Sequence, residues 1–393
     1  MKIRKECLQY HAPVIVCVLL IFVLLLLPTG YEHAVQYQTA ERSIGEVIEV
    51  DNSGIIDTGL VRSGEQRCVL RIRNGEFKGE TVNGVNLLRG SLEQDKLFTV
   101  GDKAQVVISH TQDKITNITM IDHYRVPWEW MMAAGFIVFL LLFAGRTGGR
   151  AICSFLLTVL ALWKLLVPLY LKGWNPIWIG LAVTLLLTTL IISLVYGFDR
   201  RCGAAVSGSF LGILVTAVLG ILFTDLFQIH GAVMAYSESL LYAGYQHLDL
   251  TQIFMASIFL GSSGAVMDLA VDITSAVYEV VEKKPDISRR EAICSGMNVG
   301  RAAMGTMTTT LLFAYSGGYI ALLMVFMAQG TPLPHIFNYK YVAAELIHTV
   351  IGSFGLVTVA PFTAVCAGTF LVGRTKESEQ SDCMEITSND RNR

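Results

Sequence analysis

The chain has 393 residues, of which 53% are hydrophobic and only 16% are charged, and its mean hydropathy is +0.52. Soluble globular domains carry about 25% charged residues, so this chain has too few polar side chains to cover a water-soluble particle. The net charge of −2 indicates no nucleic-acid or other polyanionic partner. Composition therefore predicts a protein whose surroundings are the lipid bilayer, and the apolar runs described below predict that it is an α-helical polytopic membrane protein.

The first apolar run covers residues 12–28 and follows the basic residues Lys2, Arg4 and Lys5. Basic residues before a short apolar stretch are typical of a cleaved signal peptide and of an uncleaved signal-anchor helix. No A-x-A-like cleavage site ends the run, which favours the anchor. We therefore expect residues 1–29 to form a cytoplasmic N-terminus and the first transmembrane helix. Both alternatives predict that the segment after it is exported.

Residues 30–127 have the composition of a soluble domain and show strand patterns. Apolar and polar residues alternate at period two before the turn signal Asn74-Gly75, and glycine-containing joints such as Asn83-Gly84 separate the runs. Several short strands predict a small extracytoplasmic antiparallel barrel, for which an OB-like form is one candidate. The strand-like runs are 45–50, 67–73, 104–109 and 114–122.

Apolar runs separated by short polar joints fill residues 128–372. A membrane-crossing helix needs about 20 predominantly apolar residues, and each of these runs is near or above that length. With the run at 12–28 they predict about eight transmembrane helices, and the polar residues 373–393 are expected to form a disordered cytoplasmic tail. The further runs are 129–145, 151–171, 176–197, 203–223, 251–281, 299–328 and 342–371.

Basic residues are distributed unevenly between the two sets of joints. The joints on one side hold only Lys172 and Lys340. Because excess Lys and Arg mark the cytoplasmic side, the pattern predicts that both termini lie in the cytoplasm and that residues 30–127 lie outside. The basic residues of the other set are Lys2, Arg4, Lys5, Arg146, Arg150, Arg200, Arg201, Lys283, Lys284, Arg289, Arg290, Arg374, Lys376, Arg391 and Arg393.

Three carboxylates share one stripe of the run 251–281. At 100° per residue, Asp268, Asp272 and Glu279 project in nearly the same direction. Each Asp near a helix centre costs about 2.5–3.5 kcal/mol on insertion scales, against about 0.3–0.6 kcal/mol gained per Leu or Ile. We therefore expect the two aspartates to face the bundle interior, a partner or water, and to line an ion pathway or bind a cation or proton. Glu279 lies near the cytoplasmic end, where a solvated helix-end charge explains it better.

A buried structural pair is the alternative for the aspartates, with Lys164 or Arg301 as its basic member. The run 299–328 is rich in small and hydroxyl residues, which either pack helices closely or line a polar pathway. Glycines at 261–264 and 317–318 predict that both runs are discontinuous helices, as in the sites of many transporters. The pathway candidates from this second run are Arg301, Thr306, Thr309 and Thr310.

Glu345 and His348 form an E-x-x-H pair in the last run. Such pairs hold metals in some helical bundles, but only one copy is present, so a structural or pathway-lining role is favoured over metal binding. No P-loop, HExxH, GxSxG or CxxC motif occurs, which favours neither an enzyme nor a bound cofactor. The eight cysteines are scattered along the chain and are interpreted as structural.

Short motifs occur along nearly the whole chain. They lie at 145–150 (GRTGGR), 264–268 (GAVMD), Ser288, 295–296 (SG), 300–301 (GR), 304–307 (MGTM) and 314–315 (AY). In these motifs the chain resembles the YibE/F-like family of bacterial multi-pass membrane proteins. The family pattern has an Asn where this chain has Thr309, so what the family implies about a site is weakened at that position. The resemblance implies a bacterial cytoplasmic-membrane protein and implies no substrate.

Together these features favour a secondary transporter or permease component for an unknown small solute or ion. Its polar intramembrane site is expected on the sixth and seventh helices. The alternative is a membrane-anchored sensor or scaffold that presents the β-domain and transports nothing. A second copy of the chain or another membrane protein is a further candidate partner.

Overall fold

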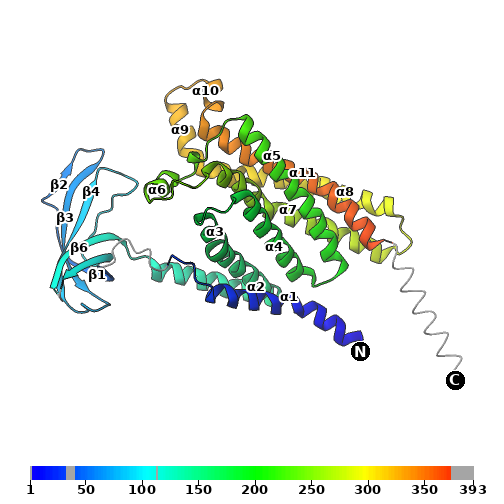
Figure 1. Ribbon diagram of the computed structural model, residues 1–393, viewed down its shortest axis with the longest axis horizontal. Coiled ribbons are helices and arrows are strands. Elements are labelled where there is room, and N and C mark those ends of the chain that lie inside the picture. Colours follow the sequence, from blue (N-terminus) through cyan, green and yellow to red (C-terminus); the bar gives the residue numbers. More distant parts are fainter. Residues whose placement is uncertain (1, 32–39, 112–113, 373–393) are drawn as a thin grey trace. The chain divides into compact units, whose positions relative to one another are not determined.

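A computed structural model describes residues 2–31, 40–111 and 114–372 (Figure 1). The chain divides into two compact units, which are described separately. The helical unit comprises Met1–Tyr31 and Ala144–Arg393, and Glu32–Phe143 forms the unit that contains the β-strands. The tail predicted at 373–393 lies outside the described residues.

Five of the six strands close a small barrel. The sheet order is β1-β5-β6-β4-β3-β2, and β1 also pairs with β3, which joins the two ends of the five-stranded ring. All pairs are antiparallel except β4 with β6. The predicted barrel is thus confirmed, although it is not antiparallel throughout. The strands are β1 (Ala40–Asp51), β2 (Ile55–Asp57), β3 (Arg62–Ile72), β4 (Thr81–Arg89), β5 (Lys103–Thr111) and β6 (Lys114–His123).

The predicted strand runs lie within β1, β3, β5 and β6, except that the run 67–73 extends one residue past the end of β3 at Ile72. The strands β2 and β4 were not predicted. The joint expected at Asn83-Gly84 is wrong, because both residues pair with β3 inside β4. A Cβ at Gly84 would lie 2.5 Å from Cδ1 of Leu70, so this glycine makes room for a core side chain. A glycine inside a strand often marks such a close approach.

The pleat of β3 explains why the predicted alternation forms a strand. Cys68, Leu70 and Ile72 are at most 2% exposed and point into the barrel core, whereas Arg67 and Arg71 on the opposite face of the strand are exposed. Successive side chains of a strand point to opposite faces, so this sequence buries one face only in an extended conformation.

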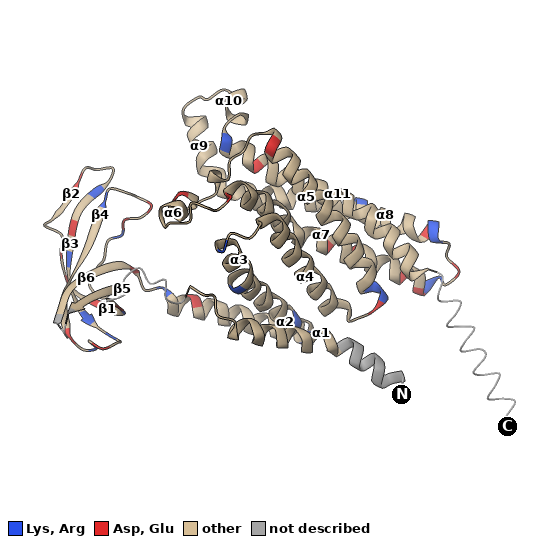
Figure 2. Ribbon diagram, viewed as in Figure 1, with Lys and Arg blue, Asp and Glu red and all other residues tan. Residues whose placement is uncertain are grey.

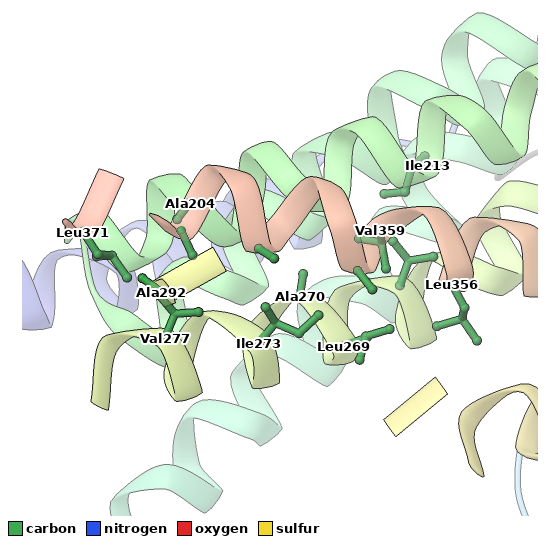
Figure 3. Close-up of a cluster of buried hydrophobic side chains, with 14 of the residues drawn as sticks. Ala204, Ile213, Leu269, Ala270, Ile273, Val277, Ala292, Leu356, Val359 and Leu371 are labelled. Carbon is green, nitrogen blue, oxygen red and sulfur yellow. The ribbon is translucent and has the colours of Figure 1, made fainter. Parts of the chain in front are cut away.

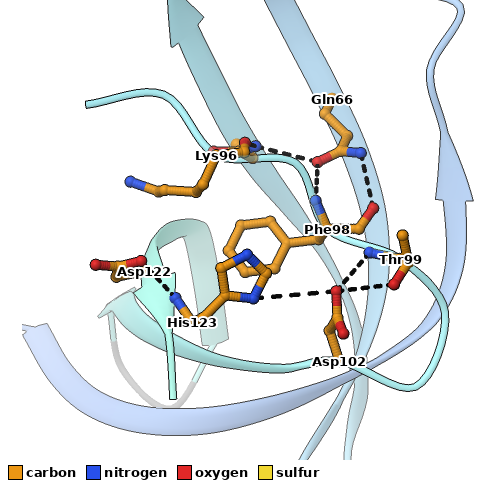
Figure 4. A network of polar contacts seen from close by, with 8 residues as sticks. Gln66, Lys96, Phe98, Thr99, Asp102, Asp122 and His123 are labelled. Carbon is orange, nitrogen blue, oxygen red and sulfur yellow. Dashed lines mark hydrogen bonds and ion pairs between the residues drawn. The ribbon is translucent and has the colours of Figure 1, made fainter. Parts of the chain in front are cut away.

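A buried glutamine fixes the loop between β4 and β5 to the barrel (Figure 4). Gln66 is 1% exposed; its Nε2 donates to the carbonyl of Phe98 at 3.0 Å, and its Oε1 accepts from the Phe98 backbone N–H at 2.9 Å. Asn86 donates to the same Oε1 at 3.0 Å. Further along the loop, Asp102 accepts from the Thr99 backbone N–H at 2.7 Å. Every polar atom of the Gln66 amide is therefore engaged, as buried amides require.

In the described part of the chain, six helices are long and apolar enough to cross a membrane, and α1 adds a shorter apolar stretch, His11–Leu26. Charged side chains are sparse along these helices (Figure 2). The helices are α1 (Lys2–Leu26), α2 (Val126–Ala161), η1 (Leu162–Leu166), α3 (Val167–Leu171), α4 (Pro176–Tyr196), α5 (Arg200–Leu226), η2 (Gly231–Val233), α6 (Ser237–Tyr242), α7 (Leu250–Lys283), α8 (Arg289–Ser316), η3 (Gly317–Tyr319), α9 (Ile320–Ala328), α10 (Leu333–Phe337) and α11 (Lys340–Leu371).

The helical stretch Val126–Leu171 contains 46 residues and is too long for one crossing. A straight α-helix of this length would measure about 69 Å, more than twice the hydrocarbon core. Gly145 interrupts it with non-helical angles (φ 52°, ψ −123°), at the residue where the predicted run 129–145 ends. This interruption agrees with two predicted spans, and the total of eight crossings stays a prediction.

Side-chain caps define where several helices begin. Asn175 Oδ1 accepts from the N–H of Ile177 at 3.1 Å, ahead of Pro176 at the first position of α4. Ser288 and Glu291 form a capping box at the start of α8. These side chains satisfy backbone donors that have no partner inside the helix.

The centre of the helical unit is built by α5, α7, α8 and α11 around small aliphatic side chains (Figure 3). Glycines bring α5 and α11 into close contact. A Cβ at Gly208 of α5 would lie 2.1 Å from Oγ1 of Thr363, and a Cβ at Gly355 of α11 would lie 2.1 Å from Oγ1 of Thr216. Lipid offers helices little hydrophobic gain for association, so such small-residue contacts are a main source of packing energy.

The helix break predicted at 261–264 is wrong, because α7 is one continuous helix from Leu250 to Lys283. Ser262 Oγ donates to the Ile258 carbonyl at 3.0 Å, so its hydroxyl is satisfied within the helix. Gly261 instead provides space for Tyr315, whose hydroxyl would lie 2.6 Å from a Cβ there. At 317–318, α8 passes into the 3-10 turn η3 before α9 begins, but Arg289–Ala328 stays one helical stretch of 40 residues, so the predicted discontinuity is present only as this turn.

The first helix packs against the rest of the helical unit. Cys17 is fully buried, and its thiol donates to the Cys153 carbonyl at 3.6 Å. Lys164 Nζ donates to the carbonyl of Leu27 at 3.1 Å, just beyond the end of α1. The alternative in which Lys164 pairs with the aspartates of α7 is therefore wrong.

Candidate functional site

One face of α7 carries a line of polar and small residues. Ser257, Gly261, Asp268, Asp272 and Ser275 fall within an arc of about 60° at 100° per residue. From Ser257 to Ser275 the helix rises about 27 Å, at about 1.5 Å per residue. We call these five residues the α7 line.

At one end of the α7 line lies a cluster of partly buried polar side chains. His348 of α11 has its Nε2 at 3.4 Å from the Ser257 hydroxyl, and its ring centroid is 5.6 Å from that of Tyr315 of α8. Glu345 lies one turn before His348 on the same helix. Within the described residues, Glu345 Oε1, His348 Nδ1 and the Tyr315 hydroxyl are buried and have no hydrogen-bond partner. Buried polar atoms without partners mark a place where a water, proton or small polar ligand binds favourably.

Asp268 and Asp272 are both exposed in the middle of the line, so of the three expected surroundings, the bundle interior of a single chain is excluded. The reason is that apolar side chains fill the interior face of α7. Val266, Leu269 and Ile273 are fully buried in the core shared with α5, α8 and α11. The expected alternatives that remain are a partner and water.

Near the other end, Ser275 is bound by a tyrosine from α4. The Tyr196 hydroxyl lies 2.6 Å from Ser275 Oγ and donates to the Val271 carbonyl at 2.6 Å. Glu279 follows one turn later and pairs with Lys283 at 2.5 Å, with its side chain 65% exposed. The interpretation of Glu279 as a solvated helix-end charge agrees with this geometry.

The candidates on α8 point away from the core. Arg301, Thr306, Thr309 and Thr310 are all exposed. The threonine hydroxyls donate to carbonyls of their own helix, for example Thr310 to Thr306 at 3.0 Å. Within the described residues no ion pair joins Arg301 to Asp268 or Asp272, so the alternative of a structural pair inside one chain is also wrong.

The other polar side chains of the cluster, beside Glu345 and His348, are the hydroxyl residues Ser257 and Tyr315. Across the described residues, no group of three His, Cys, Asp or Glu side chains is close enough to share a metal ion. The cluster combines carboxylate, imidazole and hydroxyl groups, which exchange protons and bind water. Proton or small-cation chemistry is what this arrangement supports best.

Three hydroxyl residues of the site were not predicted as members of it: Ser257, Tyr315 and Tyr196. Tyr315 follows the threonine-rich part of α8 in the sequence, yet only packing at Gly261 brings its hydroxyl to α7. Tyr196 ends α4 and reaches Ser275 across a sequence separation of 79 residues. Helical spacing locates residues on a face but cannot show which neighbouring helix covers that face.

Long apolar helices with glycine-mediated contacts and a polar line along one of them define a polytopic α-helical membrane protein. The family model described as YibE/F-like protein matches residues 132–373. The chain belongs to the YibE/F-like family, which confirms the resemblance seen in its motifs. No curated protein and no solved structure matches the chain.

Proposed function

We propose that this protein is a secondary transporter or permease component that moves a proton or small cation along the α7 line. The observation that carries the proposal is the length of that line, about 27 Å, which approaches the hydrocarbon core of about 30 Å. Ionisable residues inside membrane segments are rare and mark ion pathways and proton relays in many membrane proteins.

In this proposal Asp268 and Asp272 bind the coupling ion in the middle of the membrane. They lie four residues apart on one helix face, so an ion or proton passes between them by a short displacement. Glu345, His348 and Tyr315 exchange protons or water at the end of the line nearer the start of α11. Holding two aspartates in this position costs about 2.5–3.5 kcal/mol each on insertion scales, and contact with water or a partner offsets that cost.

We further propose a bacterial cytoplasmic-membrane location with about eight crossings, both termini in the cytoplasm, and the barrel outside. The distribution of Lys and Arg supports this orientation. The packing of Cys17 supports an uncleaved anchor helix at residues 1–29. The ring order β1-β3-β4-β6-β5 supports an OB-like barrel.

Ion flux through purified protein in proteoliposomes tests the transport proposal. A trapped pH dye reports proton movement when an inward proton gradient or a gradient of Na⁺, K⁺, Mg²⁺ or Ca²⁺ is imposed. We expect flux above that of empty vesicles, and we expect Asp268→Asn with Asp272→Asn to abolish it. Glu279→Gln is the matched control, because this carboxylate shares the stripe but is paired with Lys283 at the helix end. Unchanged flux in the folded double variant would refute coupling through the aspartates.

Water access to the line is tested by thiol labelling. Cysteines introduced separately as Asp268→Cys and Asp272→Cys should react with a small charged maleimide from at least one side of the membrane. A pathway exposes these positions to water, whereas lipid or a tightly packed partner shields them. Lack of reaction from both sides would count against an aqueous pathway.

The sensor or scaffold remains the second candidate, because the barrel has its own core around Leu70, Phe98 and Ile108. Deleting residues 40–122 distinguishes the two functions. A transporter should keep measurable flux in proteoliposomes after the deletion, since the α7 line remains intact. The sensor would be favoured if the full chain and the deletion variant both showed no ion flux, and if only the full chain supported the function of the protein in cells.

A further inference from the structure

Charges of opposite sign lie at the same depth on the two helices of the α7–α8 hairpin. The short connection 284–288 joins these helices. Arg301 lies about 18 Å along α8 from its start, Asp272 about 17 Å and Asp268 about 22 Å along α7 from its end, at about 1.5 Å per residue. The arginine is therefore level with the interval between the two aspartates.

These three charged side chains are exposed, and no ion pair satisfies any of them within the described residues of one chain. Charged groups at membrane depth pair with one another or reach water. The hairpin thus presents a surface with an unpaired positive charge on one helix and unpaired negative charges on its neighbour.

The surface of α8 around Arg301 is also open and composed of small residues. Ala302, Gly305 and Thr309 are exposed, and a Cβ at Gly305 would meet no atom within 4 Å. Small residues at such a surface allow the backbone of another helix to approach closely.

We propose that a second copy of this chain covers this surface, with Arg301 of each copy bridging Asp268 and Asp272 of the other. A twofold axis along the membrane normal keeps every residue at its own depth, so the arginine of one hairpin meets the aspartates of the other at the same level. A twofold interface must be self-complementary, and a patch that carries both signs meets this condition. An unrelated partner has no reason to match the depth of both charges.

Each bridge pairs one arginine with two aspartates, which leaves one negative charge for each copy. This remaining charge is available for a proton or cation, but the dimer itself does not depend on transport. Its test is therefore independent of the flux experiments.

Charge reversal in the full-length protein tests the interface. The mass of the wild-type protein in mild detergent, measured by light scattering over a dilution series, should be that of a dimer. Arg301→Asp or Asp272→Arg alone should raise the dimer dissociation constant at least about tenfold, because each reversal places like charges opposite one another across the interface. The two reversals combined in one chain should restore dimerisation. The control is Glu279→Arg, which reverses a charge that is already paired within the chain.

Cross-linking in membranes covers the case in which a reversed charge prevents insertion. A chain with Arg301→Cys and a differently tagged chain with Asp272→Cys are co-expressed, and mild oxidation should link them. The two chains each expressed alone give the background from native thiols such as the exposed Cys294. A monomeric wild-type mass together with no cross-link above background would overturn the proposal, as would reversals that leave dimerisation unchanged.

Discussion

Replacing Gln66 by leucine should release the loop between β4 and β5 from the barrel. The change is nearly neutral in volume and adds no charge, so its effect isolates the hydrogen bonds of the amide. The Gln66 side chain satisfies both the N–H and the C=O of Phe98, and its Nε2 also donates to Asn52 at 2.9 Å. In the variant, Asn86 loses the hydrogen bond to Gln66 but keeps the one that it donates to the Lys96 carbonyl at 2.6 Å. Its side chain is therefore less affected than the backbone of Phe98.

The expected cost follows from the two backbone groups left without partners. A buried donor or acceptor that loses its partner costs about 1–3 kcal/mol, so the N–H and C=O of Phe98 together cost about 2–6 kcal/mol. Phe98 is 1% exposed, and water does not reach these groups unless the loop opens. The loop should therefore open more often in the variant, while the strands of the ring keep their pairing.

Hydrogen–deuterium exchange of the full-length protein measures this opening. A loss of about 2 kcal/mol corresponds to roughly thirtyfold faster exchange in residues 91–102, at about 1.4 kcal/mol per factor of ten. Gln105→Leu is the matched control, because Gln105 is exposed on β5 and should change exchange little. Equal exchange in the Gln66 variant and the wild type would refute the role given to the buried amide.

Three other predictions concern packing, pH and thiol reactivity. Gly355→Ala should lower the free energy of unfolding by about 1–3 kcal/mol, because the added methyl group would lie 2.1 Å from a threonine hydroxyl of α5. Gly264→Ala is the control and should be neutral or stabilising, because a Cβ there meets no atom within 4 Å. Equal melting temperatures of the two variants would contradict the packing argument. Backbone N–H groups, first that of Arg89, hold the pKa of Asp95 below its usual range. The stability that Asp95 contributes is therefore present above about pH 4 and is lost as the pH falls through its lower folded pKa. Hydrogen exchange in the turn after β4 should rise with acid in the wild type, and the same dependence of exchange on pH in Asp95→Asn would contradict this. Burial raises the pKa of the Cys68 thiol from 9.0 to about 11, so maleimide at pH 8 should modify this thiol only after the barrel unfolds. Labelling of Cys68 in the native protein, measured by mass spectrometry, would contradict its burial in a closed barrel.

Local patterns were sufficient for much of the architecture. The alternation in β3 places Leu70 and Ile72 inside the barrel whatever surrounds it, because period two is a property of the strand itself. Apolar runs of membrane length predicted the long helices, since a lipid-embedded backbone must satisfy its own hydrogen bonds. The same requirement explains why glycines at 261–264 do not break α7: in lipid a continuous helix is the cheapest way to pair its N–H and C=O groups.

The sequence by itself determined that Asp268 and Asp272 share one stripe of one helix, because the helical repeat relates residues only to their own axis. Only the tertiary structure decided that this stripe is exposed, since α5, α8 and α11 pack against the opposite, apolar face of α7. It also brought His348 and Tyr315 to the same line from helices distant in sequence. Which helices become neighbours depends on the summed fit of many small side chains, such as Gly208 against Thr363, and no local repeat encodes that sum.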